Sequence, residues 1–419
     1  MLSRRAFIAA IPLSLSAATA ARLTKEEDGF LEDLSRRCFR FFWEQSDSGT
    51  GLARDRALAD TETPDTRKWA SSASTGFGLT GLCIAAERGW LPRADIRKRV
   101  LNTLQYYAGS AFQEHGWFYH FVDCATGERR NTTEVSDIDT ALLLAGIVTA
   151  QEYFHNDAEI GRAAKAIWDR IDFRWMMNGN PALLSMHWKP EDGFSPRFWD
   201  HHCELGIMYL LGIASATSPM PVDSWYAWKR PTVSYGGYSY ISGAPPLFVH
   251  QYSQAWIDFR HREKREPHTN WFNNSVTATR AHRQFCIDLK DQFPGYSENI
   301  WGITSSDTAH GYRAWGGPPA TKNIDGSVVP CAAGGSLMFA PDICVAALME
   351  MRRQFGDRIY KRYGFVDAFH PINGWTNKDV IGIDVGITLL SAENLRTGNV
   401  WKWFMRNRQV QHAMSQIFA

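Results

Sequence analysis

Apolar residues recur at spacings of three and four over most of this 419-residue chain, which is the periodicity of an α-helix with a buried face. The segment 30–44 carries the pattern at Leu31, Leu34, Cys38 and Phe41. The same pattern predicts further helices over 74–88, 94–107, 138–153, 158–171, 203–214, 248–259, 276–287, 341–355, 385–395 and 400–405. Two-residue alternation, which is typical of strands, is scarce, so the chain is predicted to be all-α.

The expected helices are separated by long loops rich in Gly, Pro and Trp, such as 178–197 and 311–333. Structureless loops of this length in a compact domain are usually functional. Residues 21–419 contain no linker-like or low-complexity segment, so we expect a single domain. About a dozen helices, arranged in pairs, favour an (α/α)6 barrel, or toroid, whose loops form a large pocket at one end. The alternative is an open helical solenoid, although no fixed repeat is visible.

One short β-hairpin is expected within this helical fold. The segment 115–122 contains the alternating stretch HGWFYHFV, which is typical of a strand. Residues 124–128 follow it and are expected to form the turn.

The amino-terminal residues 1–20 have the features of an export signal. The sequence SRRAF at 3–7 precedes a modest apolar stretch at 9–18, and ATA at 18–20 is a small-x-small cleavage site. The paired arginines are similar to a twin-arginine signal, and a generic secretion signal is the alternative. We therefore expect a periplasmic or secreted protein that matures near residue 21.

Charge and composition exclude several classes of partner. The 45 Lys and Arg residues are balanced by 44 Asp and Glu, whereas nucleic-acid binding depends on a surplus of clustered cations. No nucleic acid is therefore expected as a partner, and the apolar segments are too short for stable membrane insertion. The 17 tryptophans can serve the core or offer flat faces to sugar rings. The oligomeric state does not follow from the sequence.

The seven cysteines are scattered and include no Cys-x-x-Cys pair. This spacing argues against zinc-ribbon and thioredoxin-like sites. Most of the cysteines lie in apolar contexts and are expected to be buried free thiols, although one disulfide is possible. Neighbouring histidines such as His201 and His202 point about 100° apart on a helix and rarely share an ion, so no metal and no cofactor are expected.

The first candidate cluster of chemistry-bearing residues lies at 131–140. Ser136 can cap the helix that follows, with Asp137 and Asp139 in its first turn. The alternative, which can coexist with capping, is that Glu134 and Asp139 face a cleft and bind sugar hydroxyls.

The second cluster contains Glu204, a few residues after Trp188, which is a candidate for stacking on substrate. If a helix starts near Asp200, the helical neighbours of Glu204 include Met208 and Leu211, which are apolar. Partial burial raises the pKa of a carboxyl group, which favours a protonated acid near neutral pH. The alternative is a Glu paired with a buried Arg or His.

The third cluster is the segment 381–386, in which Asp384 is placed to cap a helix. Flanking glycines could let substrate or water approach this carboxylate closely. Glu204 and Asp384 together would supply the protonated acid and the ionised carboxylate that glycosidic cleavage requires.

Two further segments interleave aromatic residues with amides and carboxylates and are predicted to form walls of the substrate site. The first is 250–258, with His250 and Gln251, and the second is 296–302. The second segment contributes Tyr296, Glu298 and Trp301.

At these residues the chain resembles a bacterial family known as "putative glucoamylase", whose characterised members include endo-β-1,2-glucanases. The matching segments are FLEDLSRRCFRFFWE, ASTGFGLTGLCIAAERGW, GWFYHFVDCATGER, EVSDIDTALLLAG, LSMHWKPEDGF, ELGIMYLLGIAS, LFVHQYSQAWIDFR, GYSENIWGITSSD, RYGFVDAFHP and IGIDVG. The resemblance implies an (α/α)6 barrel and an inverting acid/base hydrolysis. By position it implies Glu204 as general acid, Asp384 as general base, and Glu134 and Asp139 as pocket-lining acids.

These observations predict an exported glycoside hydrolase that acts on a β-linked glucan or oligosaccharide, of which β-1,2-glucan is favoured. Glu204 would protonate the leaving oxygen and Asp384 would activate water. Three alternatives stay open: an exo-acting glucosidase or transglycosylase on the same substrates, a non-catalytic carbohydrate-binding protein, and a polysaccharide lyase.

Overall fold

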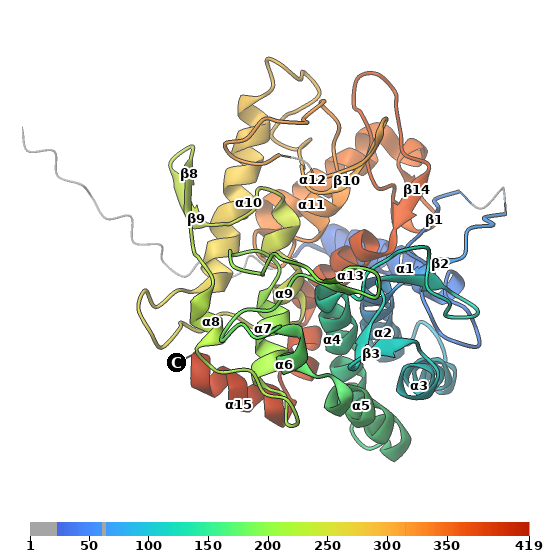
Figure 1. Ribbon diagram of the computed structural model, residues 1–419. Helices are drawn as coiled ribbons and strands as arrows, with labels where there is room; N and C mark the ends of the chain where they lie inside the picture. The colour runs from blue at the N-terminus through green and yellow to red at the C-terminus, as the bar shows by residue number, and fades with distance from the viewer. Residues whose placement is uncertain (1–22, 61–63, 315, 419) are drawn as a thin grey trace, which may run out of the picture.

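The fold is an (α/α)6 barrel, in which an inner ring of helices is surrounded by an outer ring (Figure 1). The computed structural model describes residues 23–60, 64–314 and 316–418. The expected signal peptide at 1–20 therefore lies outside the described residues, and the expected single domain over 21–419 stays a prediction. The α-helices are α1 Lys25–Glu44, α2 Ser72–Glu87, α3 Arg93–Gly109, α4 Asp137–Tyr153, α5 Ala158–Arg170, α6 Phe173–Met176, α7 Gly206–Ile213, α8 Ser224–Ala227, α9 Tyr252–Trp256, α10 Trp271–Asp288, α11 Pro330–Gly334, α12 Pro341–Phe355, α13 Gly382–Arg396, α14 Asn399–Phe404 and α15 Arg408–Ile417.

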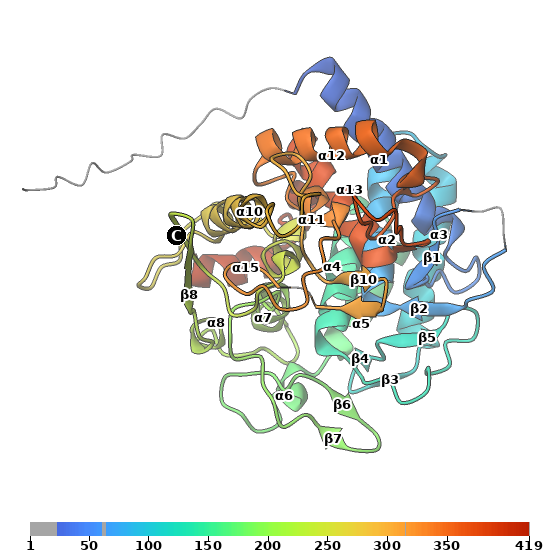
Figure 2. The ribbon, with the colours of Figure 1, turned by 90° about the horizontal axis from the view of Figure 1, so that it is seen from above.

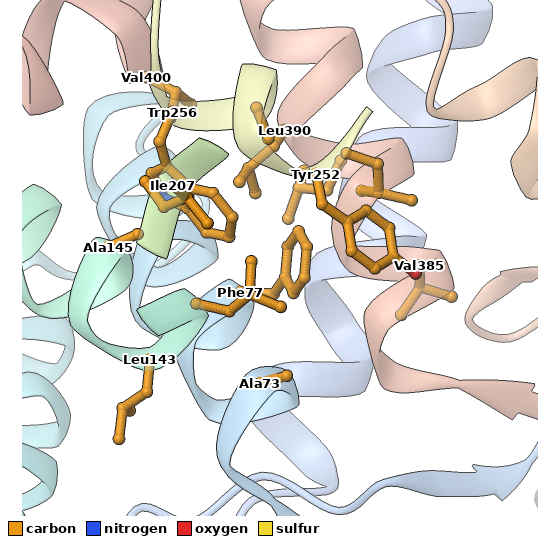
Figure 3. Close-up of a cluster of buried hydrophobic side chains, with 14 of the residues drawn as sticks. Ala73, Phe77, Leu143, Ala145, Ile207, Tyr252, Trp256, Val385, Leu390 and Val400 are labelled. Atoms are coloured by element: carbon orange, nitrogen blue, oxygen red, sulfur yellow. The ribbon is translucent and has the colours of Figure 1, made fainter. Parts of the chain in front are cut away.

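The inner helices are apolar or small-residue segments that are buried on nearly every side. These helices are α2, α4, α7, α9, α11 and α13. A helix without a polar face is stable only when other helices surround it. At the centre of the barrel, Phe77 of α2 contacts Tyr252 and Trp256 of α9, with ring centroids 5.6 and 4.7 Å apart (Figure 3).

The outer helices bury one face and leave the other in contact with solvent. They are α1, α3, α5, α10, α12 and α15. In α5, for example, Ile160, Ala164 and Ile167 are buried at helical spacing, and the residues between them are mostly charged or small. Figure 2 shows α1, α3, α10 and α12 around the more central α2, α4, α11 and α13.

The ring closes through α13, which packs against both α1 and α2 near the other end of the sequence. Arg88, the C-cap of α2, adds a buried ion pair, because its guanidinium donates to Glu393 of α13 at 2.7 Å and Glu393 is 1% exposed. An open solenoid has no such contact between its first and last repeats, so the closed barrel is the correct alternative.

Two glycines allow α2 and α4 to pack at backbone distance. A Cβ atom added to Gly146 would lie 2.1 Å from the carbonyl oxygen of Gly76, and one added to Gly76 would lie 2.3 Å from the carbonyl oxygen of Leu142. Neither contact can be relieved by a rotamer change, because both partners are main-chain atoms.

We therefore expect Gly146→Ala to lower the free energy of unfolding by about 3 kcal/mol, because the two inner helices must move apart. The matched control is Gly161→Ala in α5, where a new Cβ meets nothing within 4 Å. That substitution should raise the free energy of unfolding by about 0.5 kcal/mol through the better helix propensity of alanine. Chemical denaturation followed by circular dichroism measures both, and equal effects would contradict the close packing.

Short strands decorate the barrel as isolated two-stranded pairs. They are β1 Arg56–Leu58, β2 Trp69–Ser71, β3 Gln113–Glu114, β4 Trp117–Phe118, β5 Phe121–Asp123, β6 Trp188–Lys189, β7 Gly193–Phe194, β8 Thr232–Tyr235, β9 Tyr238–Ile241, β10 Ser306–Thr308, β11 Gly311–Arg313, β12 Tyr360–Lys361, β13 Gly364–Phe365 and β14 Asp379–Ile381. Most pairs are local hairpins, but β1 pairs with β14 and β2 pairs with β5. These two long-range pairs hold the segments that precede α2 and α13 close together.

The hairpin expected at 115–122 is only partly correct. Residues 123–128 form the expected turn, with the Gly127 N–H donating to the Asp123 carbonyl and a bridge between Val122 and Arg129. The segment before the turn, however, forms two separate strands. The first, β4, pairs with the preceding strand β3, and the second, β5, pairs with the distant β2. Sequence alternation identified strand-forming residues but not their partners, which depend on tertiary packing.

Two of the predicted helices differ clearly from the structure. The helix expected at 203–214 begins only at Gly206, and the one expected at 248–259 is a 3₁₀-helix, η1 Leu247–His250, followed by the short α9. A second 3₁₀-helix, η2, spans Gly356–Arg358. The helix α15 was not predicted, although its buried residues follow the expected spacing.

No helix within the described ranges combines the length and apolar character needed to cross a membrane. All seven cysteines are free thiols, and six of them are buried, as expected.

Candidate active site

A cavity of about 670 Å³ lies at the amino-terminal ends of the inner helices. Its lining residues come from the first turns of α2, α4, α9 and α13 and from the loops and short strands around them. They are Asp55, Arg56, Ser71, Ala73, His120, Phe121, Arg130, Ile138, Asp139, Leu142, Glu204, Phe248, Tyr252, Tyr312, Ile381 and Ile383. Helix amino termini carry positive partial charge, so this end of the barrel favours carboxylates and polar ligands.

Glu204 lines this cavity two residues before α7. Its position is fixed by Ser253 of α9, whose hydroxyl donates to the Glu204 carbonyl at 2.6 Å and accepts from the Ile207 N–H at 2.9 Å. The helix starts late because the chain before it is tied to another segment, with the His202 N–H donating to the Lys229 carbonyl at 2.9 Å, and Glu204 lies in the turn that follows. Glu204 therefore projects from a loop instead of from the second helical turn that the sequence predicted.

The carboxyl group of Glu204 remains partly protonated near neutral pH. Burial among protein atoms raises its pKa to about 7, and the nearby charge of Asp139 acts in the same direction. The side chain is nevertheless half-buried instead of sealed, because it opens to the cavity. A carboxyl group with these properties can donate a proton to a bound ligand.

Asp139 and Glu134 form an ionic cluster around His120, which sequence reasoning missed. The Nδ1 atom of His120 lies 2.8 Å from Glu134 Oε1, and its Nε2 atom lies 3.6 Å from Asp139 Oδ1. Burial opposes a charged imidazole, but the two carboxylates outweigh it and raise the pKa of His120 to about 9. Ser136 caps α4 as predicted and donates to Asp139 Oδ2 at 2.5 Å.

Asp384 lies next to the large cavity but does not line it. It is 6% exposed and lines a separate cavity of about 20 Å³ together with Asp367 and Cys331. Ile381 borders both cavities. The structure thus places Glu204 and Asp384 in adjacent cavities, and not across one shared cavity as the sequence analysis expected. Asp384 also lies in the first turn of α13 and is not its N-cap, which is Ile381.

The pKa of Asp384 is raised to about 6. Burial causes this increase, while hydrogen bonds from Asp367 and Cys331 and the charge of Arg56 oppose it. Asp384 is therefore largely ionised at neutral pH, whereas Glu204 remains partly protonated. This is the division of protonation states that a general base and a general acid require.

The wall predicted at 250–258 reaches the cavity through Tyr252, and not through His250 or Gln251. Both of these residues are 1% exposed. The Gln251 amide donates to the Ala332 carbonyl at 2.9 Å and to Ser336 Oγ at 2.7 Å. The amide therefore links two inner helices, because a polar residue there must satisfy hydrogen bonds inside the barrel.

The wall predicted at 296–302 does not line the cavity. Tyr296 and Trp301 are buried in the core, and the Tyr296 hydroxyl donates to the Ser327 carbonyl at 2.8 Å. Glu298 points the other way, with a side chain that is 82% exposed. Trp188 is half-buried in β6 and is absent from the cavity lining as well. Large aromatic residues fill the protein core in this segment. A local sequence pattern does not distinguish such core residues from the wall of a substrate site.

Several lining residues had no local sequence signal. Asp55, Arg56 and His120 come from loops and short strands, and Tyr312 comes from the β10–β11 hairpin, so nothing nearby in sequence marks them. Tyr252 lay inside a predicted wall and could have been chosen there. Asp55, Arg56 and His120 lie in or next to the long-range β1–β14 and β2–β5 pairs.

Comparison with known proteins identifies a consistent set of relatives. The sequence profile of the family described as "Putative glucoamylase" matches residues 197–408. The exo β-1,2-glucooligosaccharide sophorohydrolase (non-reducing end) of Parabacteroides distasonis is 26% identical over 437 aligned residues, which cover 96% of this chain. The chain spans 59% of the length of that relative.

Solved structures with the same fold cover almost the whole chain. A glucoamylase-like protein from Bacteroides fragilis, described as putative, is 28% identical, with 96% of this chain and 98% of that chain covered and a TM-score of 0.85. The endo-β-1,2-glucanase of Chitinophaga pinensis, solved with sophorotriose and glucose, also has a TM-score of 0.85, with 95% of this chain and 99% of that chain covered. At 24% identity, the second likeness concerns the fold alone.

Proposed function

This chain belongs to the "Putative glucoamylase" family, and from that premise we propose that it is a glycoside hydrolase that cleaves β-1,2-linked glucan by an inverting acid/base mechanism. The observation that carries the proposal is Glu204, a carboxyl group with a pKa of about 7 at the wall of a cavity of about 670 Å³. The names of the relatives support the substrate class.

In the proposed reaction, Glu204 gives its proton to the glycosidic oxygen that leaves, either directly or through a substrate hydroxyl. A water oxygen bonds to the anomeric carbon as the old bond breaks, and the proton of that water passes to Asp384. Glu204 ends ionised and Asp384 ends protonated, so exchange with solvent must restore both. The change in charge is stabilised by the helix amino termini that surround the cavity.

The position of Asp384 favours inversion over retention. A retaining mechanism requires the second carboxylate to bond directly to the sugar. Asp384 is 6% exposed and lines the small neighbouring cavity instead of the large one, so it is poorly placed for such a bond. Its own cavity of about 20 Å³ is large enough for one water molecule, which needs roughly 10–15 Å³. Asp384 is therefore suited to act on a water instead of on the sugar.

The test is hydrolysis of linear β-1,2-glucan, with β-1,3- and β-1,4-glucans as controls. We expect short β-1,2-linked products only from the first substrate, and NMR of the fresh products should show the α-anomer that inversion creates. Fresh β-anomer would contradict inversion. Tight glucan binding without turnover would instead support the alternative of a non-catalytic binding protein.

A second groove supports cleavage within long chains. It has a volume of about 520 Å³ and shares Arg56 and Tyr312 with the large cavity. Its lining residues are Arg56, Asp307, Thr308, Gly311, Tyr312, Trp375, Thr376, Asn377, Lys378 and Asp379. An aromatic side chain with nearby amide, carboxylate and ammonium groups is suited to a sugar ring. A glucan that occupies both the large cavity and the second groove would extend past the bond being cut.

We accordingly expect Trp375→Ala to raise KM for long β-1,2-glucan about tenfold, because one stacking contact of about 1.4 kcal/mol is lost. Hydrolysis of the shortest cleavable oligosaccharide should be unaffected, since that ligand need not reach the second groove. Trp188→Ala is the matched control, because Trp188 lines neither the large cavity nor the second groove. Equal KM values for wild type and Trp375→Ala on long glucan would favour the exo-acting alternative.

We also propose that the protein is exported by the twin-arginine route, which carries folded proteins. Seven free thiols are compatible with folding in a reducing compartment before export. Changing Arg4 and Arg5 together to lysine should retain the protein in the cytoplasm. Cell fractionation measures this, and unchanged export would indicate the generic secretion signal.

A further inference from the structure

Asp367 is a second buried carboxyl group in direct contact with Asp384. It follows β13, is 3% exposed and borders the same cavity of about 20 Å³. A hydrogen bond joins the two side chains. Two carboxylates cannot form a hydrogen bond, so one of the pair must carry a proton.

The two oxygens of Asp367 have different surroundings. Oδ2 accepts from the Asp307 N–H at 2.7 Å and from the Asn377 amide at 3.2 Å. Oδ1 is fully buried and has no donor from the backbone or a side-chain amide, hydroxyl or guanidinium among the described residues. Oδ1 is thus the oxygen that can itself carry a hydrogen and donate it to Asp384.

Asp384 has the better surroundings for negative charge. It lies in the first turn of α13, where the helix dipole favours a carboxylate, and Cys331 donates a weak hydrogen bond to it. The positive charge of Arg56 acts on Asp384 in the same sense. Asp367 instead faces the negative charges of Asp384 and Asp307. These different surroundings give the two carboxyl groups different protonation states, with Asp384 ionised and Asp367 protonated.

Other titratable groups around the pair do not reverse this order. The charge of Asp55 opposes the ionisation of Asp384, but Asp55 itself is paired with Arg56 at 3.0 Å. Tyr252 and Tyr312 also face Asp384. Burial raises the pKa of both phenols, so they stay neutral at working pH.

We propose that Asp367 is a positioning residue that holds the shared proton on Oδ1 and donates it to Asp384, so that Asp384 keeps the negative charge of the pair. The inference rests on the proposed function, because it assigns Asp384 as the base that deprotonates water. Burial raises the pKa of Asp367 well above its usual range, as a permanent donor requires.

A hydrogen-bond chain also connects the pair to the large cavity. Arg56, which lines that cavity, donates to Asp307 Oδ2 at 2.8 Å. Asn377 donates to the same oxygen at 2.9 Å and to Asp367 Oδ2 at 3.2 Å. Asp367 is held in place through this chain, and its remaining oxygen is left to orient Asp384.

The kinetic test compares Asp367→Asn, Asp367→Ala and Asp384→Asn. An asparagine can accept from Asp307 with its oxygen and donate to Asp384 with its amide, so it replaces the protonated acid. We expect Asp367→Asn to lower kcat about fivefold, Asp367→Ala about 100-fold and Asp384→Asn about 1,000-fold. Asp342→Asn, at an exposed ion pair with Arg280, is the control for charge loss alone.

The pH profile separates positioning from a purely structural role. Without the donor, Asp384 binds its proton more tightly, so Asp367→Ala should move the acidic limb of kcat/KM to higher pH, and Asp367→Asn should restore it. If Asp367→Asn loses as much activity as Asp384→Asn, the proton lies on Asp384 and the proposal is overturned. An unshifted acidic limb in Asp367→Ala would overturn it as well.

A spectroscopic test does not depend on hydrolysis. In the Glu204→Gln background at pH 8, infrared spectra should contain a carbonyl band from protonated Asp367. Adding Asp367→Asn should remove part of that band, and an unchanged band would contradict the proposal. If this band behaves as expected but no glucan is cleaved by the wild-type protein, the proposed function fails while the proton assignment stands.

Discussion

Glu204→Gln is expected to lower kcat on β-1,2-glucan at least 1,000-fold, the largest effect of any substitution considered for this protein. The amide keeps the shape of the side chain but has no acidic proton for the leaving oxygen. General acid catalysis contributes about 10²–10⁴-fold, and an unassisted alkoxide is a poor leaving group. Steady-state assays of released reducing ends measure the loss, and KM should change little because the amide can still hydrogen-bond to a sugar.

The pH dependence of the wild-type enzyme follows from the same pair of groups. Asp384 must be ionised, so activity falls as pH drops below about 6. Glu204 must be protonated, so activity also falls as pH rises above about 7. We expect a narrow bell-shaped profile of kcat/KM with its optimum between these values. The residual activity of Glu204→Gln should lack the alkaline limb.

Glu298→Gln is the matched control for the Glu204 substitution. Glu298 was predicted from the sequence as a substrate contact, but its side chain is 82% exposed and does not line the cavity. Its substitution should leave kcat and KM at wild-type values. If Glu204→Gln and Glu298→Gln had similar activities, the role given to Glu204 would have to be abandoned.

Asp384→Asn is expected to have the second largest effect, a loss of about 1,000-fold in kcat. An amide cannot take a proton from water at any working pH, so the acidic limb of the profile should disappear with the activity. The change should not unfold the protein, because an amide can still accept a hydrogen bond from Asp367. A thermal unfolding midpoint close to that of the wild type checks this point.

Two outcomes would count against Asp384 as the base. Near wild-type turnover would show that another carboxylate activates water. Asp55 and Asp139, the carboxylates that line the large cavity besides Glu204, would then be tested. Formation of a covalent glycosyl-enzyme at another carboxylate, detected by mass spectrometry, would contradict inversion itself.

Local sequence was sufficient to predict most of the long helices, because their pattern reflects short-range geometry. Continuous apolar segments such as 137–153 can be stable only inside the barrel, and the one-sided pattern of 158–170 suits an outer helix. The apolar neighbours of Glu204 also predicted its raised pKa correctly, although the helix begins after it.

Local sequence pattern gave wrong predictions where the role of a side chain depends on its contacts with residues that are distant in the sequence. Gln251 and Trp301 belong to segments with the composition of a sugar-binding wall, but both side chains are buried in the core. A local pattern does not show whether such a side chain turns towards a cavity or into the core. His120 had no signal because its partners Glu134 and Asp139 approach it only when the chain before α4 folds back.

By itself, the sequence determined a helical barrel and an acidic residue, Glu204, among apolar neighbours. It could do so because helix periodicity and burial follow from residues three and four positions apart. Only the tertiary structure decided which carboxylates meet. Asp367 and Asp384 are brought together by packing between distant segments, and the Arg56–Asp307–Asn377 chain that supports them crosses more than 300 residues of sequence. Because a pKa depends on every charge within a few ångströms, the protonation state of this pair exists only in the folded molecule.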